Sequence, residues 1–113
     1  MPMAAAPAGA TAEQLQQKRE SLWMVVMLND DYTPFDWVQD LLIRLFGRTS
    51  EEAMMVTQSV HRRGRGIAGV YPRAKAVRLA ALAVRQAREA GHPFTCIARP
   101  FVLEEGDGDS VFV

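Results

Sequence analysis

The sequence predicts an α+β domain in which three helices pack on a three-stranded, mostly antiparallel sheet, with the element order βααβαβ. Two observations lead to this prediction. Short apolar segments, partly β-branched, suit strands at residues 22–28, 67–71 and 94–99. Longer segments between them repeat apolar side chains at helical spacing and are bounded by helix start and stop signals.

The first strand and the first helix have the clearest signals. Residues 22–28, LWMVVML, form an apolar run that ends at polar Asn29, as expected of a buried strand. The TPFD stretch at 33–36 predicts a helix start in which Thr33 caps the free backbone amides and the proline occupies the first turn. Gly47 supplies the stop after an apolar face made of Phe35, Val38, Leu41, Leu42, Leu45 and Phe46.

The second helix is predicted to begin at Ser50, where Glu51 and Glu52 place negative charge at the positive end of the helix dipole. It ends before Gly64, at the basic string HRRGRG. One face of this helix carries Ala53, Thr57, Val60 and His61.

The second strand, the third helix and the last strand complete the order. Residues 67–71 have strand composition weakened by neighbouring glycines, and Pro72 opens an Ala-rich helix that runs to about residue 90 and stops at Gly91. Its narrow apolar stripe is predicted from Val77, Ala80, Ala81, Val84 and Ala87. The strand at 94–99 ends at Pro100.

A chain of 113 residues with 49% hydrophobic and 23% charged residues suits one small domain with tails. Residues 1–21 are rich in Ala, Pro, Gly and Gln, and we expect a flexible N-terminal arm. Residues 22–100 form the predicted core. Residues 101–113 are acidic and glycine-rich, which predicts a disordered tail.

Composition excludes several classes of function. Thirteen basic and thirteen acidic residues balance, so the whole molecule has no electrostatic reason to seek nucleic acid or anionic lipid. The single cysteine, Cys96, rules out an internal disulfide and fits a reducing compartment. No segment approaches the ~20 apolar residues of a membrane span, and the N-terminus lacks signal-peptide features. We therefore expect a cytoplasmic protein.

Metal and catalytic motifs are weak. His61, His92 and Cys96 are the only nitrogen and sulfur ligands, and their spacing is not that of a zinc site. The carboxylates of the NDD stretch at 29–31 could hold Mg²⁺, but no phosphate-binding loop accompanies them. No nucleophile motif or dinucleotide fingerprint is present. The sequence predicts neither an enzyme nor a bound metal or cofactor.

The basic segment at 61–66, HRRGRG, has two interpretations. Its Arg62, Arg63 and Arg65 could bind nucleic acid or a ribosome, with further cations nearby at Arg73, Lys75 and Arg78. Alternatively, it is a solvated helix end whose cations suit the negative pole of the dipole. No aromatic stacking platform accompanies the charges, which favours the second interpretation.

Three polar residues, Asn29, Asp30 and Asp31, follow directly after the first strand. Capping the next helix needs only Thr33, so the additional acceptors suggest a ligand. A primary ammonium group carries three N–H donors that seek oxygen acceptors, and a free protein N-terminus supplies one. The cluster therefore predicts a cation-binding site beside apolar material.

Three motifs, VVMLNDDYTPFDWV, EEAMMVTQSVHRRGRGIAGVY and AGHPFTCIARP, occur in this order between residues 23 and 100. In this combination the chain resembles the ClpS adaptor family. The resemblance implies a non-enzymatic adaptor that recognises destabilising N-terminal residues and delivers the substrate proteins that begin with them to a Clp-type AAA+ unfoldase. It also implies that Asn29, Asp30 and His61 hold the substrate's α-amino group.

The resemblance further implies a pocket for the substrate's first side chain, usually Phe, Tyr, Trp or Leu. Its walls fall on Thr33, Phe35, Val38, Thr57, Val60 and Phe94. This chain departs from the family pattern at Phe35 and Thr57, where Met is common. It departs again at Ala74 and Leu79, where many members carry residues that meet the unfoldase's N-terminal domain, so altered docking is expected.

Overall fold

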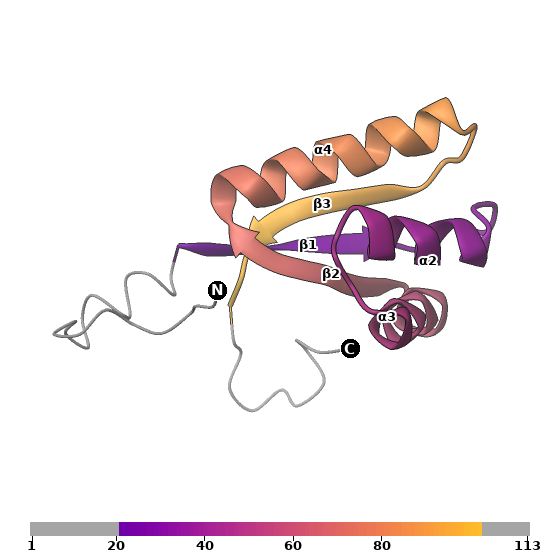
Figure 1. Cartoon of the computed structure of the whole chain (residues 1–113), viewed down its shortest axis with the longest axis horizontal. Coiled ribbons are helices and arrows are strands. Elements are labelled where there is room, and N and C mark those ends of the chain that lie inside the picture. The colour runs from indigo at the N-terminus through magenta and orange to yellow at the C-terminus, as the bar shows by residue number, and fades with distance from the viewer. Residues whose placement is uncertain (1–20, 103–113) are drawn as a thin grey trace, which may run out of the picture.

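The structure is a computed structural model that describes residues 21–102 (Figure 1). Its elements follow the predicted order: β1 (Leu22–Leu28), α2 (Phe35–Arg44), α3 (Ser50–Arg63), β2 (Arg65–Pro72), α4 (Arg73–Glu89) and β3 (Thr95–Pro100). The expected arms and tail, apart from Ser21, Phe101 and Val102, lie outside the described residues. Within the described range, no helix is long and apolar enough to cross a membrane.

The sheet has the strand order β2-β1-β3, and both pairs of neighbours are antiparallel. The α+β prediction with an antiparallel sheet is therefore confirmed. Leu28 at the end of β1 pairs with Arg65 and Thr95, whereas Trp23 near its start pairs with Tyr71 and Pro100. The sheet consequently has two distinct ends: one near Leu28 and one near Trp23.

One core unites the helices with the sheet. Val25 and Met27 of β1 are fully buried in it, together with side chains of α2, α3 and α4. In Figure 1, α4 runs along β3 and β1, while α3 lies by β2, the strand at the other edge of the sheet. A Cβ at Gly66 of β2 would come within 3.0 Å of the Val56 carbonyl oxygen and of Val60 Cγ2, so this glycine lets α3 lie close to the sheet.

One predicted helix cap is wrong, and one predicted helix start is confirmed. Thr33 does not cap α2; the N-cap is Pro34, without a side-chain hydrogen bond, because the Thr33 hydroxyl donates to the Asp30 carboxylate instead. Helix α3 begins at Ser50 as predicted, and its N-cap is the preceding residue, Thr49. The Thr49 hydroxyl accepts from the Glu52 amide and the Glu52 carboxylate accepts from the Thr49 amide, a complete capping box.

The predicted apolar stripe of α4 is also partly wrong. Ala80 and Ala87 are buried as expected, but Val77 is 48% exposed and Ala81 is exposed. The buried face is instead Ala76, Leu79, Ala80, Ala83 and Ala87. This small-residue face lets the helix approach the sheet closely. Compared with the prediction, the helix is oriented so that the larger Leu79 is buried. Leu79 therefore packs in the core and does not lie on a docking surface.

Strand boundaries differ slightly from the prediction. Strand β2 covers Arg65–Pro72 rather than 67–71, and β3 begins at Thr95 rather than Phe94. Glycine weakens strand propensity, but here both glycines are buried: α3 packs against Gly66, and the Tyr71 ring of the same strand lies over Gly69. Close packing thus explains why the strand extends through residues of low propensity.

Candidate functional site

A pocket opens at the Leu28 end of the sheet, where β1 passes into the loop that leads to α2. It encloses about 280 Å³ of space free of protein atoms, part of it continuous with solvent. Residues from β1, the loop, α2, α3 and the segment before β3 line it: Leu28, Asn29, Asp30, Thr33, Phe35, Val38, Thr57, Val60 and Phe94. Three separate stretches of sequence therefore meet at one hollow.

Of the nine predicted site residues, His61 is the one that does not line this pocket. It lies in the last turn of α3, and its ring packs edge-on against Phe35 with 4.9 Å between ring centroids. His61 is exposed and Phe35 is 50% exposed, so both stand at the surface of the molecule. The imidazole thus adjoins the pocket through the Phe35 ring.

The Asp30 carboxylate organises the loop at the pocket mouth. Its Oδ1 accepts hydrogen bonds from the amides of Tyr32 and Thr33, both at 2.8 Å. The Thr33 hydroxyl donates to Oδ2 at 2.8 Å and lies 3.0 Å from Oδ1. These bonds form an Asx-type turn that fixes the carboxylate beside the hollow.

The same surroundings set the charge state of Asp30. Partial burial raises its pKa, but hydrogen bonds from Tyr32 and Thr33 and the nearby positive charge of His92 lower it by more. The net pKa lies below the usual value for an aspartate. The pocket mouth therefore carries a fixed negative charge at neutral pH.

A backbone hydrogen bond ties the loop to the end of α3. The Asn29 amide donates to the Gly64 carbonyl oxygen at 3.0 Å. Gly64 ends α3 in the left-handed region, with φ of 87°, where a glycine is favoured. Because His61 precedes Gly64 by three residues, this bond keeps the loop carrying Asn29 and Asp30 close to the last turn of α3.

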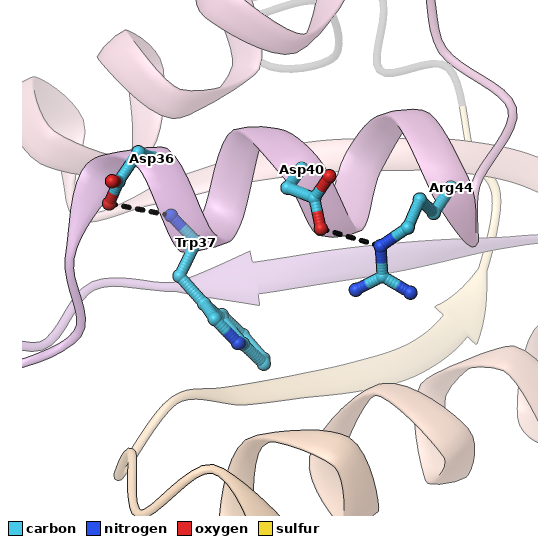
Figure 2. A network of polar contacts seen from close by, with 4 residues as sticks. All are labelled: Asp36, Trp37, Asp40 and Arg44. Carbon is cyan, nitrogen blue, oxygen red and sulfur yellow. Dashed lines mark hydrogen bonds and ion pairs between the residues drawn. The ribbon is translucent and has the colours of Figure 1, made fainter.

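The apolar wall of the pocket contains the most deeply buried aromatic residue of the described chain. Phe94 is 1% exposed, and the Trp37 ring packs edge-on against it at 5.8 Å between centroids. Trp37 also contacts His92 at 5.0 Å. Figure 2 shows the Trp37 side chain extending from α2 toward β3. The Trp37 backbone amide donates to the Asp36 carboxylate, which points away from the indole ring.

The segment before β3 is held by Arg88 of α4. Its Nη1 donates to the carbonyl oxygens of Phe94 at 2.7 Å and His92 at 2.9 Å. Charged donors make strong hydrogen bonds to carbonyl groups, so this guanidinium fixes the backbone that presents Phe94. Arg88 thereby positions a pocket residue from a helix that does not itself reach the pocket.

Thr57 provides a buried hydroxyl in the pocket wall. It is 3% exposed, and its Oγ1 donates to the Ala53 carbonyl oxygen at 2.7 Å. The hydroxyl is thus satisfied by its own helix, which removes the cost of burying it. The wall can therefore accept an apolar side chain although it contains threonine.

Sequence reasoning missed several contributors. Leu28 lines the pocket, and its place as the last apolar residue before Asn29 was an available signal. Trp37, Arg88 and His92 act through contacts between elements far apart in the chain. No pattern within the single sequence indicates those contacts.

Other groups offer little reactive chemistry. Burial raises the pKa of the Cys96 thiol to about 12, and its Sγ lies 3.6 Å from the Ala80 carbonyl oxygen in the core. Between residues 21 and 102, no three His, Cys, Asp or Glu side chains cluster closely enough to hold a metal ion. The basic segment forms the exposed end of α3, with Arg62 and Arg63 in the last turn and Arg65 at the start of β2.

An apolar hollow with a fixed carboxylate at its mouth, set in a small α+β fold, defines a ligand-binding domain. Residues 18–97 match the sequence model of one family, described as ATP-dependent Clp protease adaptor protein ClpS. The chain belongs to this ClpS family, whose members are adaptors and not enzymes.

Individual relatives agree with this assignment. The chain is 41% identical over 90 residues to the ATP-dependent Clp protease adapter protein ClpS of Deinococcus radiodurans, covering 80% of each chain. It is 40% identical over 92 residues to the protein of the same name from Cupriavidus taiwanensis, covering 80% of this chain and 85% of the relative. Among solved structures, it is similar to Agrobacterium tumefaciens ClpS2 bound to L-phenylalaninamide, with a TM-score of 0.69 and 32% identity over 73% of this chain and 99% of that one.

Proposed function

We propose that this pocket binds the first residue of a substrate protein, and that the adaptor delivers that substrate to a Clp-type AAA+ unfoldase. The apolar wall takes a bulky first side chain, and Asn29, Asp30 and His61 receive the α-amino group. The observation that carries the proposal is the charged Asp30 carboxylate fixed at the mouth of a hollow whose lining includes Phe94. Phenylalaninamide, bound by the Agrobacterium relative, has a free amino group and a phenyl side chain.

The energies of the two contacts are sufficient for specific binding. Burying one large apolar side chain contributes about 1.5 to 3 kcal/mol. Each hydrogen bond between the ammonium group and a charged acceptor adds roughly 1.5 to 3 kcal/mol before the cost of association. Affinity in the micromolar range or better is expected.

Acetylation of the substrate's N-terminus should abolish this recognition. It removes the positive charge and leaves the Asp30 carboxylate facing a methyl group in place of an ammonium group. A partly buried carboxylate without its partner costs free energy, so the same group that attracts a free N-terminus rejects a blocked one.

A titration with three ligands tests the proposal. A fluorescent Phe-first peptide, its N-acetylated twin and a single-stranded RNA are each added to the protein. Binding of the free peptide alone supports the adaptor function. If RNA alone binds, with strong dependence on salt, the proposal is wrong and the basic segment at 61–66 is the functional surface.

The departures at Phe35 and Thr57 bear on which first residues are accepted. A wall bordered by the Phe35 and Phe94 rings suits a flat side chain, or one that is not branched at Cβ, better than one branched at Cβ. We expect Phe-first, Tyr-first, Trp-first or Leu-first peptides to bind more tightly than Ile-first or Val-first ones. A panel in which Ile-first and Phe-first peptides bind equally would contradict this.

The partner that receives the substrate is the N-terminal domain of the unfoldase. Ala74 is exposed at the start of α4 and can contribute to that docking surface, whereas Leu79 is buried and cannot. We place this activity in the cytoplasm, because the chain's single cysteine is a free, buried thiol compatible with a reducing compartment.

A further inference from the structure

A group of cations lies at the start of α4, at the end of the sheet away from the pocket. Arg73, Lys75 and Arg78 are all exposed and together form what we call the α4 basic patch. The Arg73 guanidinium lies 5.1 Å from the centroid of the Trp23 ring, and Lys75 Nζ lies 5.3 Å from that of Tyr71. Both cations are therefore held against aromatic faces at one place on the surface.

The α4 basic patch lacks anionic partners within the folded core. The first turn of α4 contains no acidic residue, and the ion pair found between residues 21 and 102 is that of Asp40 with Arg44 on another helix. The positive end of a helix dipole favours carboxylates and disfavours cations. Three cations at this position thus create a local positive potential that a negatively charged segment would relieve.

The chain itself leaves the fold beside this patch. Pro100, the last residue of β3, pairs with Trp23, the residue on which Arg73 stacks. The Phe101 amide then donates to the Leu22 carbonyl oxygen at 2.9 Å, which fixes where the following residues start. Figure 1 shows the end of β3 close to the start of α4.

The residues that follow are strongly acidic. The segment 104–109, EEGDGD, carries four carboxylates in six residues and no cation. Glu104 follows Phe101 by three residues, a span of about 10 Å in an extended chain. The first carboxylates are thus within reach of Arg73 and Lys75 without crossing the molecule.

We propose that the acidic segment 104–109 folds back onto the α4 basic patch and covers it. The tail acts as an intramolecular competitor that shields these cations from other anionic surfaces. Because it is tethered a few residues away, its effective concentration at the patch is in the millimolar range. The contact is electrostatic and exposed, so salt screens it.

Chemical cross-linking of the intact protein tests this contact directly. The sequence contains two lysines, Lys18 and Lys75, so a carbodiimide that joins an ammonium to a neighbouring carboxylate gives few products. We expect amide bonds from Lys75 to Glu104 or Glu105 in the monomer at low salt, and their loss at about 0.5 M salt. Absence of the Lys75 products, or their persistence at high salt, would overturn the proposal.

A binding experiment tests whether the tail shields the patch. A variant with Glu104→Gln, Glu105→Gln, Asp107→Asn and Asp109→Asn should bind a fluorescent hexaglutamate peptide about tenfold more tightly than the unmodified protein. Changing Arg73, Lys75 and Arg78 to Gln in that variant should remove the gain. The matched control changes Arg62, Arg63 and Arg65, which lie toward the other end of the sheet, and should leave the gain intact.

Two outcomes separate this proposal from the proposed function. Binding of a Phe-first peptide should be the same with and without the tail charges, because the pocket is at the Leu28 end of the sheet. If hexaglutamate binds both proteins equally and Lys75 forms no cross-link to the tail, the patch is open to a separate acidic protein and the tail is not its occupant.

Discussion

The two sides of the pocket are built in different ways. The polar rim consists of Asn29, Asp30 and Thr33, which lie within five consecutive residues. Hydrogen bonds inside one loop join Asp30 to Thr33, and one backbone bond ties Asn29 to Gly64. The apolar wall takes side chains from β1, α2, α3 and the segment before β3: Leu28, Phe35, Val38, Thr57, Val60 and Phe94. The rim is thus a local structure, and the wall is a product of the whole fold.

This difference separates binding from stability. A substitution in the rim removes a charge or a hydrogen bond from a partly exposed loop, so it should weaken ligand binding more than folding. A substitution in the wall opens a cavity in the core that also supports the sheet, so it should affect folding first. Single substitutions can therefore break either side separately.

The largest expected effect is on the wall. Phe94→Ala should lower the free energy of unfolding by about 3 to 5 kcal/mol, because Phe94 is fully packed against Trp37. Phe35→Ala is the matched control, since Phe35 lines the same pocket but is 50% exposed, and it should cost less than half as much. Urea denaturation of the two variants measures this. A loss of about 1 kcal/mol or less for Phe94→Ala would show that this part of the wall does not support the core.

The second effect is on the rim. Asp30→Ala should weaken binding of a Phe-first peptide on the order of 10- to 100-fold, since it removes a charge-assisted acceptor worth roughly 1.5 to 3 kcal/mol. Arg63→Ala, which removes an exposed charge from the end of α3, should change the affinity by less than about twofold. Fluorescence anisotropy measures both, and similar losses would contradict the role assigned to Asp30.

Asp30→Asn distinguishes charge from loop structure. Its side-chain oxygen can still accept from the Tyr32 and Thr33 amides, and the Thr33 hydroxyl can turn to accept from the new amide group. We expect a loss of affinity smaller than that of Asp30→Ala, with the fold of the loop retained. An unchanged affinity would mean that the negative charge plays no part in binding.

The same contrast explains what the sequence could predict. The positions of all six elements and eight of the nine pocket residues follow from local patterns and family resemblance. The capping role predicted for Thr33 was wrong, because several neighbouring hydroxyls and carboxylates can satisfy the same amides. The pattern does not decide among them.

The prediction of which face of α4 is buried was partly wrong, and the reason is related. A helix rich in alanine has little amphipathic contrast, so its sequence does not determine which face is buried. The packing of Leu79 decides the face, and this depends on the sheet beneath it. The contacts of Arg88 and Trp37 with the Phe94 region likewise join elements distant in the chain, where local sequence carries no signal.

A smaller effect is expected within the rim. Thr33→Val removes the hydroxyl that donates to Asp30 but leaves the backbone amide bond of residue 33. One hydrogen bond in a partly exposed loop contributes about 1 kcal/mol, so the affinity for a Phe-first peptide should fall by about fivefold. Thr33→Ser restores the hydroxyl and should recover most of the loss. If Thr33→Ser binds as weakly as Thr33→Val, the methyl group rather than the hydroxyl is the important part of this residue.

The smallest expected effect is the dependence of stability on pH. The pKa of Asp30 is lower in the folded protein than in the unfolded chain, so its charged form stabilises the fold above the unfolded value, near pH 4. That contribution is lost as the pH falls through the lower, folded value. The difference in unfolding free energy between the unmodified protein and Asp30→Asn should therefore be constant at neutral pH and should shrink below about pH 4. Denaturation at several pH values measures it, since the other carboxyl groups titrate alike in both proteins and cancel. A difference that stays the same down to the acid limit would mean that the loop hydrogen bonds, and not the charge of Asp30, hold the rim together.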